Sequence, residues 1–259
     1  MRPFGGTVLL AAVLIAGPAA AGAWPMPKGE TQVILKYDRQ SADDGFDLDG
    51  TIQPLPVRRT DEAASVFAEH GLTDRFTLQM KAEAQRGQDQ FVDYEGSGPL
   101  EIGLRAKLFE NARTALSLYG GYVHAGEGRN AGYAAPGAGD GDWEVRLLAG
   151  RSGTTKGRWV GGRATFAEVQ LAHVFRDGLP DETRMDTTVG LDFGPNWSVM
   201  LQSYAGRAEE EGQAVWLNGE ASILRRLGDW RVQAGWRQAL AGRETPVSSG
   251  PVVALWRKF

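Results

Sequence analysis

Apolar and polar residues alternate without interruption from Arg75 to Ala84 (RFTLQMKAEA). One set of alternate positions is wholly apolar: Phe76, Leu78, Met80, Ala82 and Ala84. The other set is wholly polar: Arg75, Thr77, Gln79, Lys81 and Glu83. Successive side chains of a β-strand point to opposite faces of its sheet. The stretch therefore predicts a strand with one apolar face and one polar face.

The same alternation recurs along most of the chain and predicts about twelve strands. The other predicted strands cover residues 30–38, 63–72, 100–109, 113–124, 143–151, 158–175, 184–193, 215–226 and 251–259, with two more that begin at Trp197 and Trp230. Within 158–175 the apolar positions change parity near Phe166, which predicts a β-bulge. The predicted fold class is all-β.

The connections between these strands fall into two length classes. Short turns are predicted near residues 73, 111, 154, 195 and 228, and mostly longer loops lie between them. The longest predicted loop runs from Arg39 to Asp61 and is rich in aspartate. Outer-membrane barrels combine an even number of strands with short periplasmic turns and longer outer loops. We therefore expect an antiparallel transmembrane β-barrel with both ends on the periplasmic side.

The N-terminal residues have the order of a secretory signal peptide. Arg2 precedes an apolar run from Val8 to Ala16, and the small residues Ala21-Gly22-Ala23 follow Gly17-Pro18. We expect cleavage after Ala23, so that residues 1–23 form the signal peptide and residues 24–259 form the barrel. The alternative is a membrane anchor, for which the apolar run is too short.

The C-terminal strand ends on Phe259. A terminal Phe that closes an alternating strand resembles the C-terminal signature of bacterial outer-membrane barrels. Arg257 departs from that signature, which prefers an aromatic or aliphatic residue there. The resemblance implies two partners: the barrel-assembly machinery, through Phe259, and the lipid of the outer membrane of a Gram-negative bacterium.

Composition narrows the function classes. Hydrophobic residues make up 42% of the chain and the mean hydropathy is −0.31. These values argue against helical spans but fit a barrel, in which apolar and polar positions alternate. The net charge of −4, without a basic block, argues against a nucleic-acid partner. The chain contains no Cys, which excludes disulfides and thiolate metal sites.

On the barrel interpretation, the apolar parity faces lipid and the polar parity faces the lumen. The predicted lumen residues are Lys81, Glu83, Glu101, Arg105, Lys107, Glu144, Arg146, Arg184, Asp186, Asp192, Glu220, Arg231, Gln233 and Arg237. Both signs are nearly balanced, so the lining can neutralise itself through ion pairs or can surround water. Twelve strands lie between filled eight-stranded barrels and open sixteen-stranded porins, so both alternatives stay open.

Tryptophans near predicted strand ends are candidates for a membrane-interface girdle, because each ring is apolar with one polar edge. The candidates are Trp24, Trp143, Trp159, Trp197, Trp230 and Trp236. Ordinary core packing is the alternative for each of them.

Catalysis and metal binding have little support. The chain has three histidines, His70, His124 and His173. The best candidate for a catalytic base is His173, with Ser203 or Ser222 as the nucleophile, but no local motif joins them. The aspartates between Arg39 and Asp61 lack the closing Glu of an EF-hand loop. We therefore predict no enzyme, no metal and no cofactor.

Two segments carry a resemblance to a known family. EHGLTDRFTL (Glu69–Leu78) and GPLEIGLRAKL (Gly98–Leu108) resemble the transporter-like outer-membrane family associated with meta-pathway phenol degradation. His70 replaces the Tyr of that family's pattern, and Pro99 stands where Asp is usual. The resemblance implies an outer-membrane barrel that takes up small aromatic or other apolar compounds.

Three functions remain in order of preference. The first is a passive channel or facilitator for small molecules, based on the amphipathic strands and charged lumen. The second is a closed structural barrel whose long acidic loop, Arg39 to Asp61, binds a partner. The third is an outer-membrane lipid-modifying enzyme.

Overall fold

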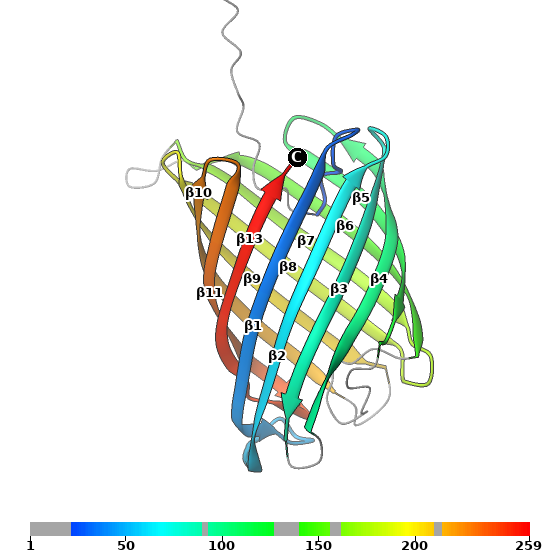
Figure 1. Ribbon diagram of the computed structural model, residues 1–259, viewed down its shortest axis with the longest axis vertical. Helices are drawn as coiled ribbons and strands as arrows, with labels where there is room; N and C mark the ends of the chain where they lie inside the picture. The colour runs from blue at the N-terminus through cyan, green and yellow to red at the C-terminus, as the bar shows by residue number, and fades with distance from the viewer. Residues whose placement is uncertain (1–21, 90–92, 127–139, 156–161, 210–213) are drawn as a thin grey trace, which may run out of the picture.

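The computed structural model describes residues 22–89, 93–126, 140–155, 162–209 and 214–259, which form a tilted-strand barrel (Figure 1). Its strands are β1 (Thr31–Phe46), β2 (Ile52–Gly71), β3 (Phe76–Gln88), β4 (Asp93–Glu110), β5 (Thr114–His124), β6 (Gly141–Thr154), β7 (Ala164–Phe175), β8 (Glu182–Phe193), β9 (Trp197–Ala208), β10 (Val215–Leu227), β11 (Trp230–Arg243), β12 (Thr245–Pro246) and β13 (Ser249–Lys258). No helix in the described ranges is long and apolar enough to cross a membrane.

Antiparallel pairing closes the sheet on itself. Neighbouring strands pair in sequence from β2 to β11, β11 pairs with β13, and β1 pairs with both β13 and β2. The short β12 adds only to the far end of β1. Twelve strands therefore form the closed wall, as the alternation predicted. A two-sheet sandwich, which alternating strands could also form, is excluded because the wall is one closed sheet.

Both ends of the barrel wall lie at the same end of the molecule, where the C-terminus is marked in Figure 1. Thr31 and Phe259 exchange backbone hydrogen bonds of 3.2 and 2.8 Å. The connections at this end follow β2, β4, β6, β8 and β10, at the five predicted turn positions. We call it the periplasmic end, following the convention for barrels with short turns beside their termini.

The predicted acidic loop from Arg39 to Asp61 is wrong. β1 continues to Phe46 and β2 begins at Ile52, with Ser41 opposite Thr60 and Phe46 opposite Ile52. Only residues 47–51 form the turn. There the N–H groups of Thr51 and Asp49 donate to the Asp47 carboxylate, which lowers its pKa. A strand that extends past the bilayer meets water on both faces, so its sequence need not alternate.

The predicted bulge near Phe166 is also absent from the strand pairing. β7 pairs without a register shift with β6, from Ala164 opposite Thr154 to Phe175 opposite Trp143. Phe166 points inward, where it packs with Met200 and Leu224. An apolar residue on the lumen side had produced the apparent change of parity.

The outer face of the barrel is apolar along the strands. Alternate residues such as Leu100, Ile102 and Leu104 on β4, and Val145 and Leu147 on β6, are exposed. Their neighbours Glu101, Arg105 and Glu144 point inward. An apolar outside with polar residues inside is the arrangement that a bilayer requires of a barrel.

Candidate functional site

A short segment before the first strand enters the barrel. We call residues 22–30 the lumen segment; residues 22–26 are buried or half-buried, and residues 27–30 are exposed at the periplasmic rim. Met26 N–H donates to Thr77 Oγ1 of β3 at 3.0 Å, and Ala23 N–H donates to Glu168 Oε2 of β7 at 2.6 Å. Ala23 and Met26 are buried. The segment therefore crosses the inside of the barrel from the β3 wall to the β7 wall.

Arg105 holds this segment in place. Its guanidinium donates to the carbonyl oxygens of Gly22 and Trp24, the latter at 3.1 Å. The same guanidinium forms a 2.9 Å ion pair with Glu69 on β2, and both side chains are buried. Gln79 donates to Glu69 at 2.6 Å. Arg105, predicted only as a lumen residue, is thus part of a buried network that anchors the lumen segment.

Apolar contacts surround the lumen segment on its β5–β6 side. Ala23 and Trp24 pack against Ala115, Tyr119 and Leu148. Gly150 lies directly under the Trp24 ring, and a Cβ at this position would come within 2.4 Å of a ring carbon. Trp24 therefore belongs to the lumen packing, and its predicted place in an interface girdle is wrong.

A second apolar cluster occupies the opposite wall. Phe166, Met200 and Leu224 pack together with Trp256 against them. These residues lie near the periplasmic ends of β7, β9, β10 and β13. The periplasmic part of the lumen is therefore lined by apolar side chains on two sides.

Charged side chains line the middle of the lumen in a ring that we call the charged belt. Its members are Lys36, Asp38, Lys81, Glu83, Glu101, Glu144, Arg146, Arg184, Asp186, Glu220 and Arg237. All of the predicted lumen residues except Arg105, Lys107, Asp192, Arg231 and Gln233 lie in it. The ring is organised into local ion-pair groups.

One group joins β6 and β8. Arg146 pairs with Glu144 at 2.6 Å and with Asp186 at 3.1 Å. Arg184 lies 3.9 Å from Glu144 and pairs with Glu182 at 2.6 Å. Each arginine therefore bridges two carboxylates, which fixes both guanidinium groups against this part of the wall.

A second group joins β1, β10 and β11. Arg237 pairs with Glu220 at 2.8 Å and lies 3.8 Å from Asp38. Lys36 lies 3.6 Å from Glu220. The Arg237 guanidinium also stands over the Tyr204 ring, 4.9 Å from its centroid. Gln233 donates to Glu220 at 3.1 Å and accepts from Trp256 Nε1 at 3.0 Å, which links this group to the second apolar cluster.

The third group lies on β3, β4 and β5. Lys81 forms an ion pair with Glu83, and Tyr119 donates to Glu101 at 2.5 Å.

The belt shows its two signs unequally to the lumen. The Lys81 side chain is 39% exposed and that of Arg184 26%, whereas the belt carboxylates Glu220 and Glu144 are 0% and 5% exposed. These two carboxylates lie against the wall, while Asp38, Glu83 and Asp186 are partly exposed beside the cations. The most exposed charged groups of the belt are therefore the cations Lys81 and Arg184, although the whole chain carries a net charge of −4.

Three predicted lumen residues lie at the periplasmic ends of their strands, away from the belt. Lys107 pairs with Glu110 at 2.7 Å, Asp192 accepts from Ser198 Oγ at 2.6 Å, and Arg231 follows Trp230 at the start of β11. Alternation assigns these residues to the inner face but does not fix their height in the barrel.

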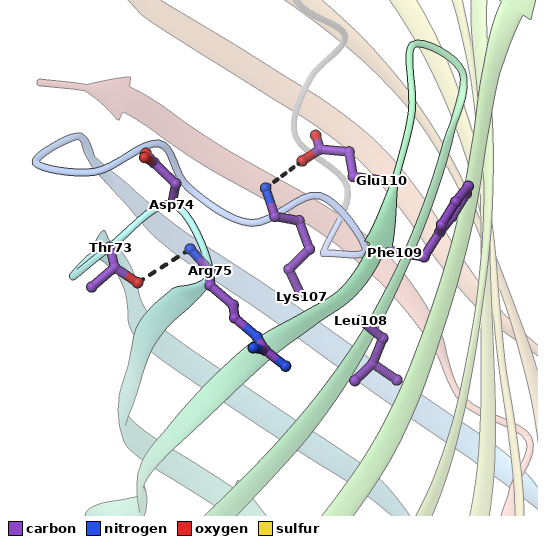
Figure 2. Close-up of a pocket in the computed structure, with 7 residues that line it drawn as sticks. All are labelled: Thr73, Asp74, Arg75, Lys107, Leu108, Phe109 and Glu110. Carbon is purple, nitrogen blue, oxygen red and sulfur yellow. Dashed lines mark hydrogen bonds and ion pairs between the residues drawn. The ribbon is translucent and has the colours of Figure 1, made fainter.

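Figure 2 shows a groove at this periplasmic rim, between the turn after β2 and the end of β4. It has a volume of about 710 Å³ and is lined by Thr73, Asp74, Arg75, Lys107, Leu108, Phe109 and Glu110. Lys107 and Glu110 pair across it, and Thr73 caps the backbone of Arg75. The groove is formed by the turn after β2 and the last residues of β4, outside the belt, so we place the functional site in the lumen.

The tryptophan candidates have different positions. Trp143, Trp197 and Trp230 are exposed on the outer face at strand ends. Trp236 is exposed but lies in the middle of β11, so its predicted strand-end position is wrong. Trp159 lies outside the described residues.

The serine and histidine candidates are not joined in the described part of the chain. His173 lies 3.3 Å from Glu209 and 3.7 Å from Asp181. Ser203 exchanges a 2.7 Å hydrogen bond with Thr187, and Ser222 donates to Glu220. Within the described ranges no group of three or more His, Cys, Asp or Glu side chains could hold a metal ion.

Sequence reasoning missed several residues of the site. Lys36 and Asp38 stand on the polar parity of β1 and could have been found by the same rule. Glu168 follows this rule too, on β7, but the expected bulge obscured it. The lumen segment carries no periodic pattern, so alternation gave no sign of it.

The closed wall, apolar outside and charged inside, defines the class: an outer-membrane β-barrel. No family model and no curated protein matches the sequence. In fold the chain is similar to the COG4313 outer membrane channel from Pseudomonas putida F1, with 15% identity over 93% of this chain and 100% of that one, at a TM-score of 0.67. It is also similar to the KdgM porin, with 8% identity over 87% and 99% of the two chains, at a TM-score of 0.53. The translocator domain of autotransporter NalP from Neisseria meningitidis gives 9% identity, 90% coverage of both chains and the same TM-score of 0.53. The expected likeness to a transporter-like outer-membrane barrel is confirmed at the level of fold.

Proposed function

We propose that the protein is a passive channel that lets small molecules cross the outer membrane. The observation that carries this proposal is the charged belt inside a closed barrel, where Lys81 is 39% exposed while the carboxylates Glu144 and Glu220 are buried. The fold likeness to proteins described as an outer membrane channel and a porin supports the same conclusion.

The lumen favours solutes with an apolar part and a negative charge. The cationic ends of the belt attract anions, and the cluster of Phe166, Met200, Leu224 and Trp256 offers an apolar surface beside it. Gln233 connects the two through its bonds to Glu220 and Trp256. Small aromatic acids have both features. They belong to the aromatic compounds that the family resemblance implies, with a negative charge in addition.

Flux into liposomes tests this proposal. Vesicles that contain the refolded barrel should swell faster with benzoate than with benzylamine, because the exposed cations Lys81 and Arg184 attract anions and repel cations. Replacing Lys81 with Glu should reduce or reverse that preference. Arg58→Glu is the matched control, since Arg58 pairs with Asp43 in an exposed position outside the lumen. Equal rates for the two solutes in the wild type would contradict the proposed selectivity.

A closed barrel without transport is the second candidate. The sequence supported this candidate through a predicted acidic loop from Arg39 to Asp61. The structure removes that support, because those residues form the ends of β1 and β2 and the turn between them. The lumen segment now favours it instead, since residues 22–26 fill part of the inside. A barrel that folds but permits no flux, even without this segment, would establish the second candidate.

We further propose that residues 1–23 are removed on export and that Phe259 engages the barrel-assembly machinery. The exposed aromatic ring of Phe259 at the periplasmic end of β13 supports this contact. Deleting Phe259 should lower the amount of assembled barrel in outer-membrane fractions without changing the amount synthesised. Unchanged assembly would remove Phe259 from this role.

We also propose that the barrel is not an enzyme. His173 contacts two carboxylates, and neither Ser203 nor Ser222 has a contact to it among the described residues. Changed envelope lipids in cells that lose the His173 imidazole would contradict this.

A further inference from the structure

Glu168 is a buried carboxylate for which no ion pair with a cation is seen in the described structure. It is 3% exposed. Its hydrogen bonds come from neutral donors: Ala23 N–H at 2.6 Å and the Gln170 side-chain amide. The guanidinium of Arg105, which binds the same segment, already pairs with Glu69 at 2.9 Å. The buried group of Arg105, Glu69 and Glu168 therefore carries one more negative than positive charge.

Burying an unpaired carboxylate is unfavourable, so such groups are normally paired with a cation. The donor that already touches Glu168 is the backbone nitrogen of Ala23, in the lumen segment. Ala23 is also the last residue of the predicted signal peptide. Cleavage of the signal peptide during export would create a positively charged α-amino group at this place, where Glu168 lacks a cation.

We propose that Glu168 is the counter-ion of the α-ammonium group that signal-peptide cleavage creates. This inference rests on the predicted signal peptide and goes beyond the proposed channel function. Water adds across the amide bond between Ala23 and Trp24, so that Ala23 keeps the carboxylate and Trp24 gains the ammonium. Trp24 N is the next backbone nitrogen after the one that contacts Glu168, so the new ammonium group forms beside the carboxylate.

Several contacts hold the new terminus near Glu168 after cleavage. Arg105 donates to Trp24 O at 3.1 Å, the Trp24 ring packs over Gly150, and Met26 N–H donates to Thr77. Loss of Gly22 and Ala23 vacates the space directly beside the carboxylate. The ammonium has three donors in place of one amide N–H, so it can replace the bond from Ala23 N–H while Gln170 keeps its bond to the other oxygen. Cleavage thus completes the packing of the lumen segment.

Reactivity of the α-amine tests this pair on protein extracted from outer membranes. Intact mass first identifies the N-terminal residue, which should be Trp24. At neutral pH, an amine-reactive ester should then modify the α-amine about tenfold more slowly in wild type than in Glu168→Gln, since a charge-assisted bond typically contributes enough free energy for such a factor. Asp192→Asn, which removes a lumen carboxylate at the same end but away from the segment, should react like wild type.

Equal rates in wild type and Glu168→Gln would overturn the pair, as would a mass that retains the signal peptide. If Glu168→Gln does not assemble, a second measurement replaces it. The mature chain is acetylated at its α-amine while it is unfolded, and it is then refolded in parallel with the untreated chain. Hydrogen exchange of the Met26 amide is measured in both. Faster exchange in the acetylated barrel supports the pair, and unchanged exchange overturns it. Neither readout depends on conduction, so both stand apart from the channel proposal.

Discussion

The ion pair between Arg105 and Glu69 is the most deeply buried charge contact described in the lumen. Both side chains are at most 3% exposed, and the guanidinium also binds two carbonyl groups of the lumen segment. Removing one partner of such a pair leaves an uncompensated buried charge. Its effect on stability should therefore far exceed that of an exposed pair.

Replacing Arg105 with Met should lower the free energy of unfolding by about 3–5 kcal/mol, because Glu69 would stay buried without its cation. Urea unfolding of the refolded barrel, followed by tryptophan fluorescence, measures this. Arg58→Met breaks the exposed 3.5 Å pair with Asp43 and should change stability by about 1 kcal/mol or less. Equal effects of the two substitutions would show that Glu69 is not sealed from water.

Which residues point inward could be predicted from the sequence, but which of them meet could not. Parity placed Lys81, Arg146 and Glu220 inside. Their partners depend on strand register and tilt, which alternation leaves open. Lys107 has the same parity as Arg105, yet it ends at the rim beside Glu110.

The lumen segment is the element that narrows the barrel. In the mature chain it keeps the bonds of Trp24 O to Arg105 on β4 and of Met26 N–H to Thr77 on β3. A mature chain that lacks residues 24–28 should therefore give larger single-channel currents than the complete mature chain. A chain shortened at residues 48–50, in the turn at the other end, is the control. Identical currents from the two shortened chains would mean that the segment does not limit the pore.

The extended hairpin of β1 and β2 offers a separate test. Backbone amides between Ser41 and Phe46 are paired with β2 and should exchange hydrogen slowly, whereas amides of a loop exchange within the dead time. Amide exchange followed by mass spectrometry distinguishes the two. Fast exchange throughout residues 39–61 would restore the loop that the sequence predicted.

The apolar outer face should tolerate no charge at mid-strand. Leu147 lies in the middle of β6 and is 41% exposed. Leu147→Arg should lower the unfolding free energy in lipid by about 2–4 kcal/mol, the range for Arg at the bilayer midplane. Leu48→Arg, in the exposed turn after β1, should have little effect. A neutral Leu147→Arg variant would place β6 outside the lipid.

Alternation predicted the elements inside the bilayer well, because lipid on one side and water on the other impose a period of two. Outside the bilayer this constraint ends, which is why the ends of β1 and β2 looked like a loop. A second failure has a different cause: Phe166 is apolar on the lumen side, because it packs against Met200 and Leu224. Apolar and polar residues do not alternate in the lumen segment, so alternation could not predict its position.

At the scale of the whole molecule, the net charge of −4 would favour cations as solutes, whereas the exposed cations of the lumen favour anions. The belt carboxylates Glu144 and Glu220 are buried, and acidic residues such as Asp47 and Asp229 lie in turns, so the net charge does not describe the pore. Electrostatic selection acts where a solute passes closest to fixed charges. The exposed ends of Lys81 and Arg184 therefore decide the selectivity.

The reversal potential of the refolded mature chain in a planar bilayer, under a salt gradient, tests this account most directly. We predict a small, steady conductance with a preference for anions, and a shift toward cations in Lys81→Glu but not in Arg58→Glu. A cation preference in the wild type, or a folded barrel that stays silent even without its lumen segment, would contradict it.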